Sequence, residues 1–132
     1  MIFVDTSFWV ALRNRRDERN QEAIALLQQH ADRVLVTSNH VRGETWTFLR
    51  RRAGHTAAVA FLDALNRSPR IRVISITDQH EETALRWLRR HDEREYSFVD
   101  ATSFALMRAL RLKETLTFDG DFAAAGFTEL RI

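Results

Sequence analysis

The N-terminal stretch Met1-Ile2-Phe3-Val4-Asp5-Thr6-Ser7 carries the first fold signal of the chain. The apolar residues at positions 2–4 have β-forming character and predict a short strand that is buried on both faces. The acid and the two hydroxyl residues that follow are typical of the first turn of a helix. A strand that passes directly into a helix is the usual opening of an α/β fold, in which helices connect parallel strands.

The same alternation of strand and helix continues along the chain. Apolar residues spaced three and four apart indicate helices, and Val99–Leu110 is apolar on nearly every face, which predicts a buried helix. After the first strand, Ile2–Asp5, we expect strands at Val34–Thr37, Ile71–Ile76, Thr115–Phe118 and, shorter, near Phe127–Leu130. Such a pattern predicts a parallel sheet covered on both faces. No linker or repeat divides it, so we expect residues 1–132 to form a single domain.

The composition is that of an ordinary globular protein. The chain has 132 residues, of which 45% are hydrophobic, with four glycines, one proline and no cysteine. The lack of cysteine excludes disulfides, thiol nucleophiles and thiolate metal sites. No apolar run reaches the roughly 18 residues that a membrane-spanning helix needs, and the first residues lack the basic start of a signal peptide. We therefore expect a cytoplasmic protein with no membrane partner.

The charge balance conceals a strong arginine bias. Lysine and arginine number 20 against 18 acidic residues, a net charge of +2, and every basic residue except Lys113 is arginine. Guanidinium groups suit bidentate contacts with phosphates. Three arginine clusters are therefore candidates for RNA binding, namely Arg13, Arg15 and Arg16, then Arg50, Arg51 and Arg52, and finally Arg86, Arg89, Arg90 and Arg94. The alternative for each cluster is a solvated helix surface.

Two acids directly follow predicted strands. Asp5 ends the first strand, and Asp119 comes after Thr115–Phe118. Ligands of an open parallel sheet bind at the carboxyl ends of its strands, so both side chains are candidates for a site there. Each acid also has a simpler interpretation, because Asp5 is able to cap the next helix and Asp119 precedes a glycine in a common turn pair.

Two further acids lie in apolar helical segments. Glu44 is at the edge of an apolar stripe, and Asp100 lies in the first turn of the Val99–Leu110 helix. Acids are almost never buried without a partner or a ligand, which makes both of them candidates for function. The alternatives are a solvated surface acid for Glu44 and a capping box with Ser97 for Asp100.

Together the four acids predict a cation site. Two of them at strand ends and two in early turns of helices are able to converge at one edge of the sheet. Repulsion and desolvation raise the pKa of clustered carboxyl groups, and a divalent cation relieves both effects. Carboxylates without histidine or cysteine select Mg²⁺ or Mn²⁺. Such an ion activates water and neutralises charge on a phosphate, which favours phosphodiester hydrolysis as the reaction.

The acidic segments also resemble, in order, the four motifs of the PIN-domain family, and specifically those of its VapC-type toxin ribonucleases. The opening stretch resembles the first motif, and Glu44, early in the helix after the second strand, resembles the second. Tyr96–Ala101 resembles the third motif and Leu116–Phe122 the fourth. The resemblance runs from residue 1 to the end of the chain, and the ordered set of four is specific.

The resemblance implies a PIN-like three-layer sandwich and an endoribonuclease that depends on Mg²⁺ or Mn²⁺. A metal-activated water would attack the phosphorus in line and leave a 5′-phosphate. The resemblance implies four catalytic acids that hold the metal, namely Asp5, Glu44, Asp100 and Asp119. It assigns Asp121 to a second metal held through water. It assigns the orientation of the carboxylates to three hydroxyl residues, namely Thr6, Ser7 and Ser103.

The resemblance also implies partners. Members of the family cut structured RNA of the translation machinery, either tRNA in the anticodon region or the sarcin–ricin loop of large-subunit rRNA. They often form homodimers. A cognate VapB-type antitoxin usually blocks the site with its C-terminal tail.

Three other interpretations compete with this one. A receiver domain has a similar size and a doubly wound sheet, but it needs an acidic pair after the first strand, where Asp5 stands alone. A PIN-domain protein that serves as a non-catalytic binding module has no need of the four acids. A PIN-domain nuclease acting on DNA is the last alternative, and the short chain, without added DNA-gripping segments, favours RNA.

Overall fold

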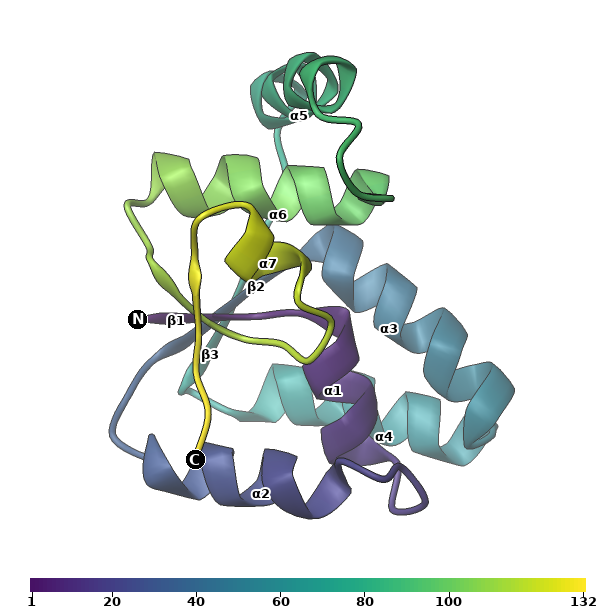
Figure 1. Ribbon diagram of the computed structural model, residues 1–132. Helices are drawn as coiled ribbons and strands as arrows, with labels where there is room; N and C mark the ends of the chain where they lie inside the picture. Colours follow the sequence, from purple (N-terminus) through teal and green to yellow (C-terminus); the bar gives the residue numbers. More distant parts are fainter.

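The computed structural model describes residues 1–132 and contains one five-stranded sheet (Figure 1). Its strand order is β3-β2-β1-β4-β5, and every neighbouring pair is parallel. The strands are β1 (Ile2–Val4), β2 (Leu35–Ser38), β3 (Ile71–Ile74), β4 (Glu114–Leu116) and β5 (Thr128–Glu129). The bounds differ from the predicted ones by at most two residues, and the predicted parallel sheet is confirmed.

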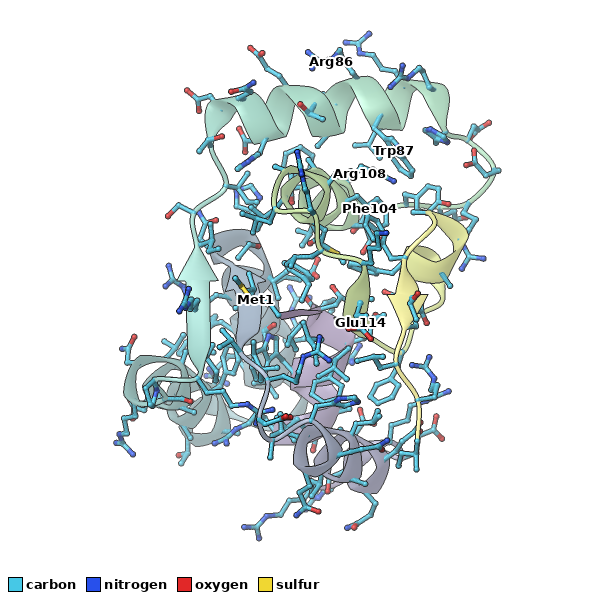
Figure 2. The ribbon with its side chains drawn as sticks, turned by 90° about the vertical axis from the view of Figure 1, so that its left-hand side faces the viewer. Met1, Arg86, Trp87, Phe104, Arg108 and Glu114 are labelled. Carbon is cyan, nitrogen blue, oxygen red and sulfur yellow. The ribbon has the colours of Figure 1, made fainter.

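Helices cover both faces of this sheet. In Figure 1, α6 and α7 lie on one face, α1, α2 and α4 on the other, and α3 beside the end where β1 passes into α1. The turned view of Figure 2 shows α5 packed outside α6. The helices are α1 (Thr6–Arg13), α2 (Asn20–Gln29), α3 (Asn39–Arg52), α4 (His55–Arg67), α5 (Asp78–Arg90), α6 (Phe98–Ala109) and α7 (Asp121–Ala124). This is the expected sandwich of helices around a sheet.

The position of β1 explains why the first strand is entirely apolar. All three of its residues are fully buried, because β2 and β4 flank the strand and helices cover both faces. On one face the ring centroid of Phe3 lies 6.1 Å from that of Phe122 in α7. Below the other face, Trp9 of α1 lies 5.7 Å from Phe61 of α4. The core therefore continues on both sides of the sheet, and the end of β1 is a fixed point in it.

The predicted buried helix is α6. Every residue from Asp100 to Met107 is buried, because the sheet lies on one side of α6 and α5 on the other. Three small side chains, those of Ala84, Ala101 and Ala105, lie between α5 and α6 and allow the two helices to pack closely. The first turn of α6, which carries Asp100, is thereby held in place from both sides.

Side-chain caps start four of the helices. Ser38 caps α3 by accepting the Val41 N–H at 3.0 Å, and Thr77 and Ser97 form capping boxes at α5 and α6. The cap of α1 is Asp5 itself. The longest helix, α3, has 14 residues, and no helix combines the length and apolar character needed to cross a membrane.

Candidate functional site

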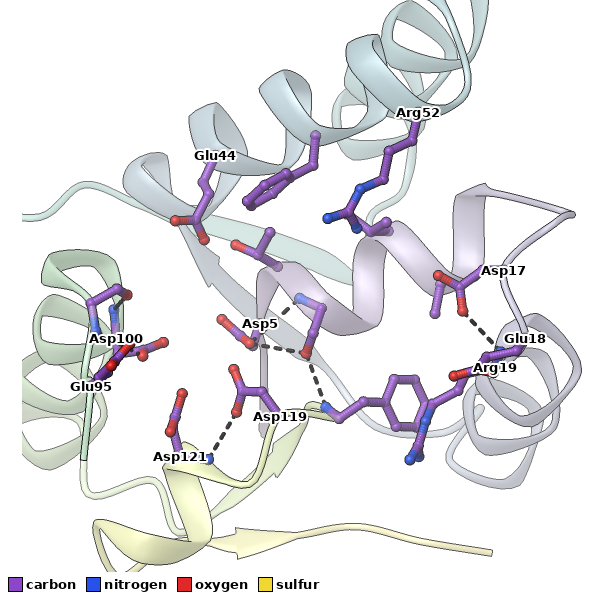
Figure 3. A pocket seen from close by; sticks show the side chains of 17 residues that line it. Asp5, Asp17, Glu18, Arg19, Glu44, Arg52, Glu95, Asp100, Asp119 and Asp121 are labelled. Carbon is purple, nitrogen blue, oxygen red and sulfur yellow. Dashed lines mark hydrogen bonds between the residues drawn. The ribbon is translucent and has the colours of Figure 1, made fainter. Parts of the chain in front are cut away.

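Asp5 is the most deeply placed acid of the site. It directly follows β1, its residue is only 2% exposed, and its carboxylate accepts the Ser7 N–H at 3.5 Å as the N-cap of α1 (Figure 3). The capping role and the predicted site role are therefore compatible, because the same carboxylate does both. A central strand that ends in an acid places a charge inside the core, which is costly without compensation.

A hydroxyl network fixes the Asp5 carboxylate. Thr117 donates to its Oδ2 at 2.9 Å, and the Ser7 hydroxyl lies 3.1 Å from the same atom. The Phe118 N–H in turn donates to the Ser7 hydroxyl at 2.9 Å. The hydroxyl oxygens of Ser7 and Thr117 are 3.0 Å apart, so these groups form one connected cluster. The Asp5 carboxylate is thereby oriented by groups from the β1–α1 junction and from the segment that follows β4.

Asp100 reaches the same place from α6. It forms a capping box with Ser97, in which the Asp100 N–H donates to the Ser97 hydroxyl at 2.9 Å and Oδ2 of Asp100 accepts the Ser97 N–H at 3.1 Å. The alternative interpretation of this acid as a cap is thus also correct, and the cap orients it. Its residue is only 7% exposed.

Asp119 completes a cluster of three carboxylates. It follows β4, is exposed, and its Oδ1 accepts the Asp121 N–H at 3.0 Å. One carboxylate oxygen each from Asp5, Asp100 and Asp119 lie within 4.8 Å of one another. Oxygen ligands at this spacing are able to share one hard divalent ion, and the donor set contains no histidine or cysteine.

Burial and mutual repulsion raise the pKa values in this cluster. Burial raises the pKa of Asp5 well above its ordinary value, and the charges of Asp119 and Asp100 raise it further. Burial likewise raises the pKa of Asp100 to about 7, against the opposing bond from Ser97, with the charges of Asp119 and Asp121 adding to the rise. A bound cation favours the charged form of each group, so the cluster fits a divalent ion.

Glu44 faces the same pocket from α3. It is half-buried and lines a hollow of about 470 Å³ together with the three clustered acids, but it is not part of the 4.8 Å cluster (Figure 3). The four predicted acids therefore share one pocket at the carboxyl end of the sheet. Three of them approach within metal-binding reach of each other, and Glu44 lies across from them.

The three predicted orienting hydroxyls have different surroundings. Ser7 bonds Asp5 as described, whereas the hydroxyl oxygens of Thr6 and Ser103 are buried without a hydrogen-bond partner. The role of orienting the carboxylates, expected of Thr6 and Ser103, belongs instead to Thr117. Its hydroxyl lies 2.9 Å from Oδ2 of Asp5 and 3.3 Å from Oδ1 of Asp119. Thr117 was missed from the sequence, although a hydroxyl residue two positions before an acid at a strand end mirrors the Asp5–Ser7 pair.

Arginines form a second hollow beside the acidic one. Its volume is about 540 Å³, and its lining has four arginines and no acid. These arginines are Arg13, Arg15, Arg16 and Arg52, and Arg52 lines the acidic pocket as well. Arg50 and Arg51, predicted with Arg52, line neither hollow. The structure thus brings together the first predicted cluster and Arg52 of the second, whereas the third cluster, Arg86, Arg89, Arg90 and Arg94, lines neither hollow.

Comparisons with known proteins agree with this geometry. The PIN-domain family model matches residues 2–128. Two curated relatives, the 23S rRNA-specific endonucleases VapC20 of Mycobacterium tuberculosis strains CDC 1551 / Oshkosh and ATCC 25618 / H37Rv, are 57% identical over 131 residues, covering 99% of this chain and 98% of theirs. The crystal structure of Mycobacterium tuberculosis VapC20, described as a sarcin–ricin loop cleaving toxin, matches all of both chains with a TM-score of 0.95 and 55% identity. The chain belongs to the PIN-domain family, among its VapC-type toxin ribonucleases.

Proposed function

We propose that this protein is an endoribonuclease toxin that hydrolyses a phosphodiester bond in the sarcin–ricin loop of 23S rRNA with Mg²⁺ or Mn²⁺. The observation that carries the proposal is the cluster of Asp5, Asp100 and Asp119, whose oxygens lie within 4.8 Å in a pocket open to solvent. Support for this RNA target comes from VapC20 of Mycobacterium tuberculosis, a 23S rRNA-specific endonuclease that cleaves the sarcin–ricin loop and is 55–57% identical to this chain over nearly its whole length.

In the proposed site, Asp5, Asp100 and Asp119 hold the metal, and Glu44 adds a fourth carboxylate from α3. When bound, a divalent ion lowers the pKa of water and neutralises charge that develops on the phosphate. The chain itself supplies rigidity. Asp5 is fixed by Thr117 and Asp100 by its capping box, so the ligand atoms need little reorganisation when the substrate arrives.

The arginine hollow gives the RNA strand a path away from the acids. Its arginines are exposed and have no ion pair, and Arg52 lies on the border between the two hollows. Phosphates on either side of the bond to be cut carry negative charge that the acidic pocket repels, whereas these guanidinium groups attract it. We therefore assign Arg13, Arg15, Arg16 and Arg52 to binding of the RNA backbone.

VapC toxins pair with VapB antitoxins, and we propose that a cognate VapB-type antitoxin inhibits this chain. A C-terminal tail lying over the acidic pocket would exclude RNA from it. The homodimer implied by the family resemblance stays a prediction, which analytical ultracentrifugation of the purified chain measures directly.

The test is cleavage of intact bacterial ribosomes by the purified protein, followed by primer extension on 23S rRNA. We expect one new 5′ end inside the sarcin–ricin loop with Mg²⁺ or Mn²⁺ and none in EDTA. Purified tRNA in a parallel reaction is the matched control for RNA choice. Cleavage confined to tRNA would contradict the proposed target, and full cleavage in EDTA would contradict the metal-dependent mechanism.

A further inference from the structure

Arg94 makes an ion pair at the edge of the acidic pocket. Its Nε and one terminal nitrogen both lie 2.9 Å from Oδ1 of Asp121. The Asp121 side chain is only 19% exposed, so the pair is partly shielded from water. Charge-assisted bonds of this length, with two donors on one oxygen, are stronger than an ordinary surface ion pair.

Both partners of this ion pair are anchored on the same part of the core. Arg94 lies in the loop between α5 and α6. In the same loop, the Tyr96 ring lies 4.7 Å from Trp87 of α5 and packs edge-on against Phe104 of α6. Asp121 starts α7, whose next residue, Phe122, lies 4.9 Å from the same Phe104 ring. The packing of both segments against Phe104 therefore brings Arg94 to Asp121.

Asp121 itself faces the candidate metal centre. It lines the pocket, and its backbone N–H donates to Asp119 at 3.0 Å. Its negative charge also raises the pKa of Asp100, after burial has done so. Arg94 does not line the pocket and approaches Asp121 from outside it. The Asp121 carboxylate thus lies at the pocket but forms its ion pair with Arg94 outside it.

Asp121 differs in this respect from every other acid of the pocket. None of the remaining lining acids is ion-paired with a lysine, arginine or histidine, and the three that cluster within 4.8 Å do not include Asp121. The structure therefore separates the acids of the pocket into a set without a basic partner and one acid, Asp121, whose charge is paired with Arg94.

We propose that Arg94 is a positioning residue that neutralises Asp121 and keeps its carboxylate out of metal coordination, so that the pocket takes one divalent ion. The proposal deepens the proposed metal-dependent function and rests on it. Arg94 stands in for a second cation. A guanidinium group stays charged at every relevant pH, and here the chain itself supplies it, so this neutralisation does not depend on the metal concentration.

Loss of Arg94 should have a specific consequence. Asp121 would be left with an unpaired charge beside Asp119 and Asp100, which adds both a ligand and negative potential to the pocket. Cation affinity should rise, although the site would lose its fixed arrangement. Coulomb energies for unit charges about 4 Å apart correspond to roughly a fivefold change in affinity in bulk water and roughly a thousandfold change near a protein surface. Because the Arg94 side chain is 42% exposed to water, the expected change lies toward the lower end, at roughly tenfold.

The experiment titrates the intact protein with Mn²⁺ and measures free Mn²⁺ by electron paramagnetic resonance. The wild-type chain should bind one ion, and Arg94→Gln should bind Mn²⁺ roughly tenfold more tightly. Arg94→Lys, which keeps the charge, should return most of the way to wild type. The control is Arg90→Gln, which removes an exposed charge from the end of α5 that does not line the pocket. When Asp121→Asn is also present, Arg94→Gln should change the Mn²⁺ affinity no more than Arg90→Gln does.

Two outcomes overturn the inference while leaving the proposed metal-dependent function intact. The first is an Arg94→Gln affinity within about twofold of wild type, and the second is an increase that persists in the Asp121→Asn background. Thermal unfolding of each variant verifies that the fold is intact, which the exposure of the Arg94 side chain leads us to expect. If the wild-type protein binds no Mn²⁺ at all, the proposed function fails and the inference fails with it. Binding that is equal in all variants overturns the inference alone.

Discussion

The acidic pocket and the arginine hollow are neighbours of similar size but opposite construction. Their volumes are about 470 Å³ and 540 Å³, and they meet at Arg52. Asp5 and Asp100 are buried and tied by hydrogen bonds, whereas the arginines of the second hollow are exposed and have no ion pair. Hydrolysis at one phosphorus atom requires metal ligands held in a fixed geometry, as in the acidic pocket. Binding of a regularly charged RNA backbone requires only positive charges placed along its path, as in the arginine hollow.

The largest effect should come from removing one fixed charge of the acidic pocket. Asp5→Asn keeps the shape of the side chain but removes a buried metal-binding charge, so we expect cleavage of rRNA to fall by roughly a thousandfold or more. The measurement is the initial rate of 5′-end formation in the sarcin–ricin loop.

Stability provides the control for this substitution. Burial and neighbouring acids raise the pKa of Asp5, so a neutral amide relieves unfavourable charge in the metal-free protein. Asp5→Asn should therefore melt in EDTA at the wild-type temperature or above it. A variant that cleaves at a rate within tenfold of wild type would contradict the role of Asp5 and, with it, the distinction between the two hollows.

The next effect should come from the hydroxyl that orients Asp5. Thr117→Val removes the donor that lies 2.9 Å from Asp5 and 3.3 Å from Asp119. Loss of such a supporting contact typically lowers metal affinity or activity by about 10- to 100-fold, and Thr117→Ser should retain most of both. Mn²⁺ titration and cleavage rates measure the change.

Thr115→Val is the matched control for Thr117→Val. Thr115 lies in β4, two residues before Thr117, and is also buried, but its hydroxyl donates to the backbone carbonyl of Phe3 at 2.9 Å and to no carboxylate. We expect Thr115→Val to lower stability without a specific loss of metal affinity. Equal losses of metal affinity in the two variants would show that Thr117 supports only the strand.

Most of the fold was predictable because its signals are local. Buried parallel strands appear as short apolar runs, and the amphipathic or fully apolar segments between them appear as helices, so the five strands lie where periodicity places them. The acids were predictable for a similar reason. An acidic residue at the end of an apolar strand, like Asp5, or inside an apolar helix, like Asp100, is unusual in such a segment and therefore indicates a functional site.

The supporting groups were less predictable because they depend on contacts between distant segments. Thr117 on a strand looks like ordinary β propensity, and only the structure brings it to Asp5, 112 positions away. The pairing of Arg94 with Asp121 depends on how a loop packs against Phe104. Thr6 and Ser103 were predicted to orient the carboxylates, but their hydroxyls are buried without a hydrogen-bond partner and bond no carboxylate.

A third, smaller effect should appear in the stability of the metal-free protein. The pKa of Asp100 is raised to about 7 in the folded state from 3.8, so the folded state binds the proton more tightly than the unfolded chain does. Its contribution to stability is present at low pH and is lost as the pH rises through about 7. In EDTA, the wild-type protein should melt roughly 5 °C higher at about pH 5.5 than at about pH 7.5.

Asp100→Asn separates the contribution of Asp100 from the titration of histidines elsewhere in the chain. The variant should lose part of the difference in melting temperature between the two pH values, and Asp5, whose pKa is also raised by burial, contributes to the remainder. Added Mg²⁺ should stabilise the wild-type protein mainly at the higher pH, where the carboxylates are free to bind it. If the wild-type protein in EDTA melts at a higher temperature at about pH 7.5 than at about pH 5.5, and Asp100→Asn does not, the raised pKa of Asp100 is contradicted.

The smallest effect should come from the border of the two hollows. Arg52→Gln removes one charge from the proposed RNA path, and Arg51→Gln removes an equal charge from the adjacent position of α3, outside both hollows. Arg52→Gln should weaken binding of sarcin–ricin RNA several-fold and lower the slope of log affinity against log salt by about 1, because one phosphate contact is lost. Fluorescence anisotropy over a series of salt concentrations, with Ca²⁺ in place of Mg²⁺ to limit cleavage, measures both quantities.

Arg51→Gln should leave the slope of log affinity against log salt unchanged. If the two variants shift it equally, RNA responds to the net charge of α3 rather than to the hollow, and the arginine hollow is then only a solvated surface.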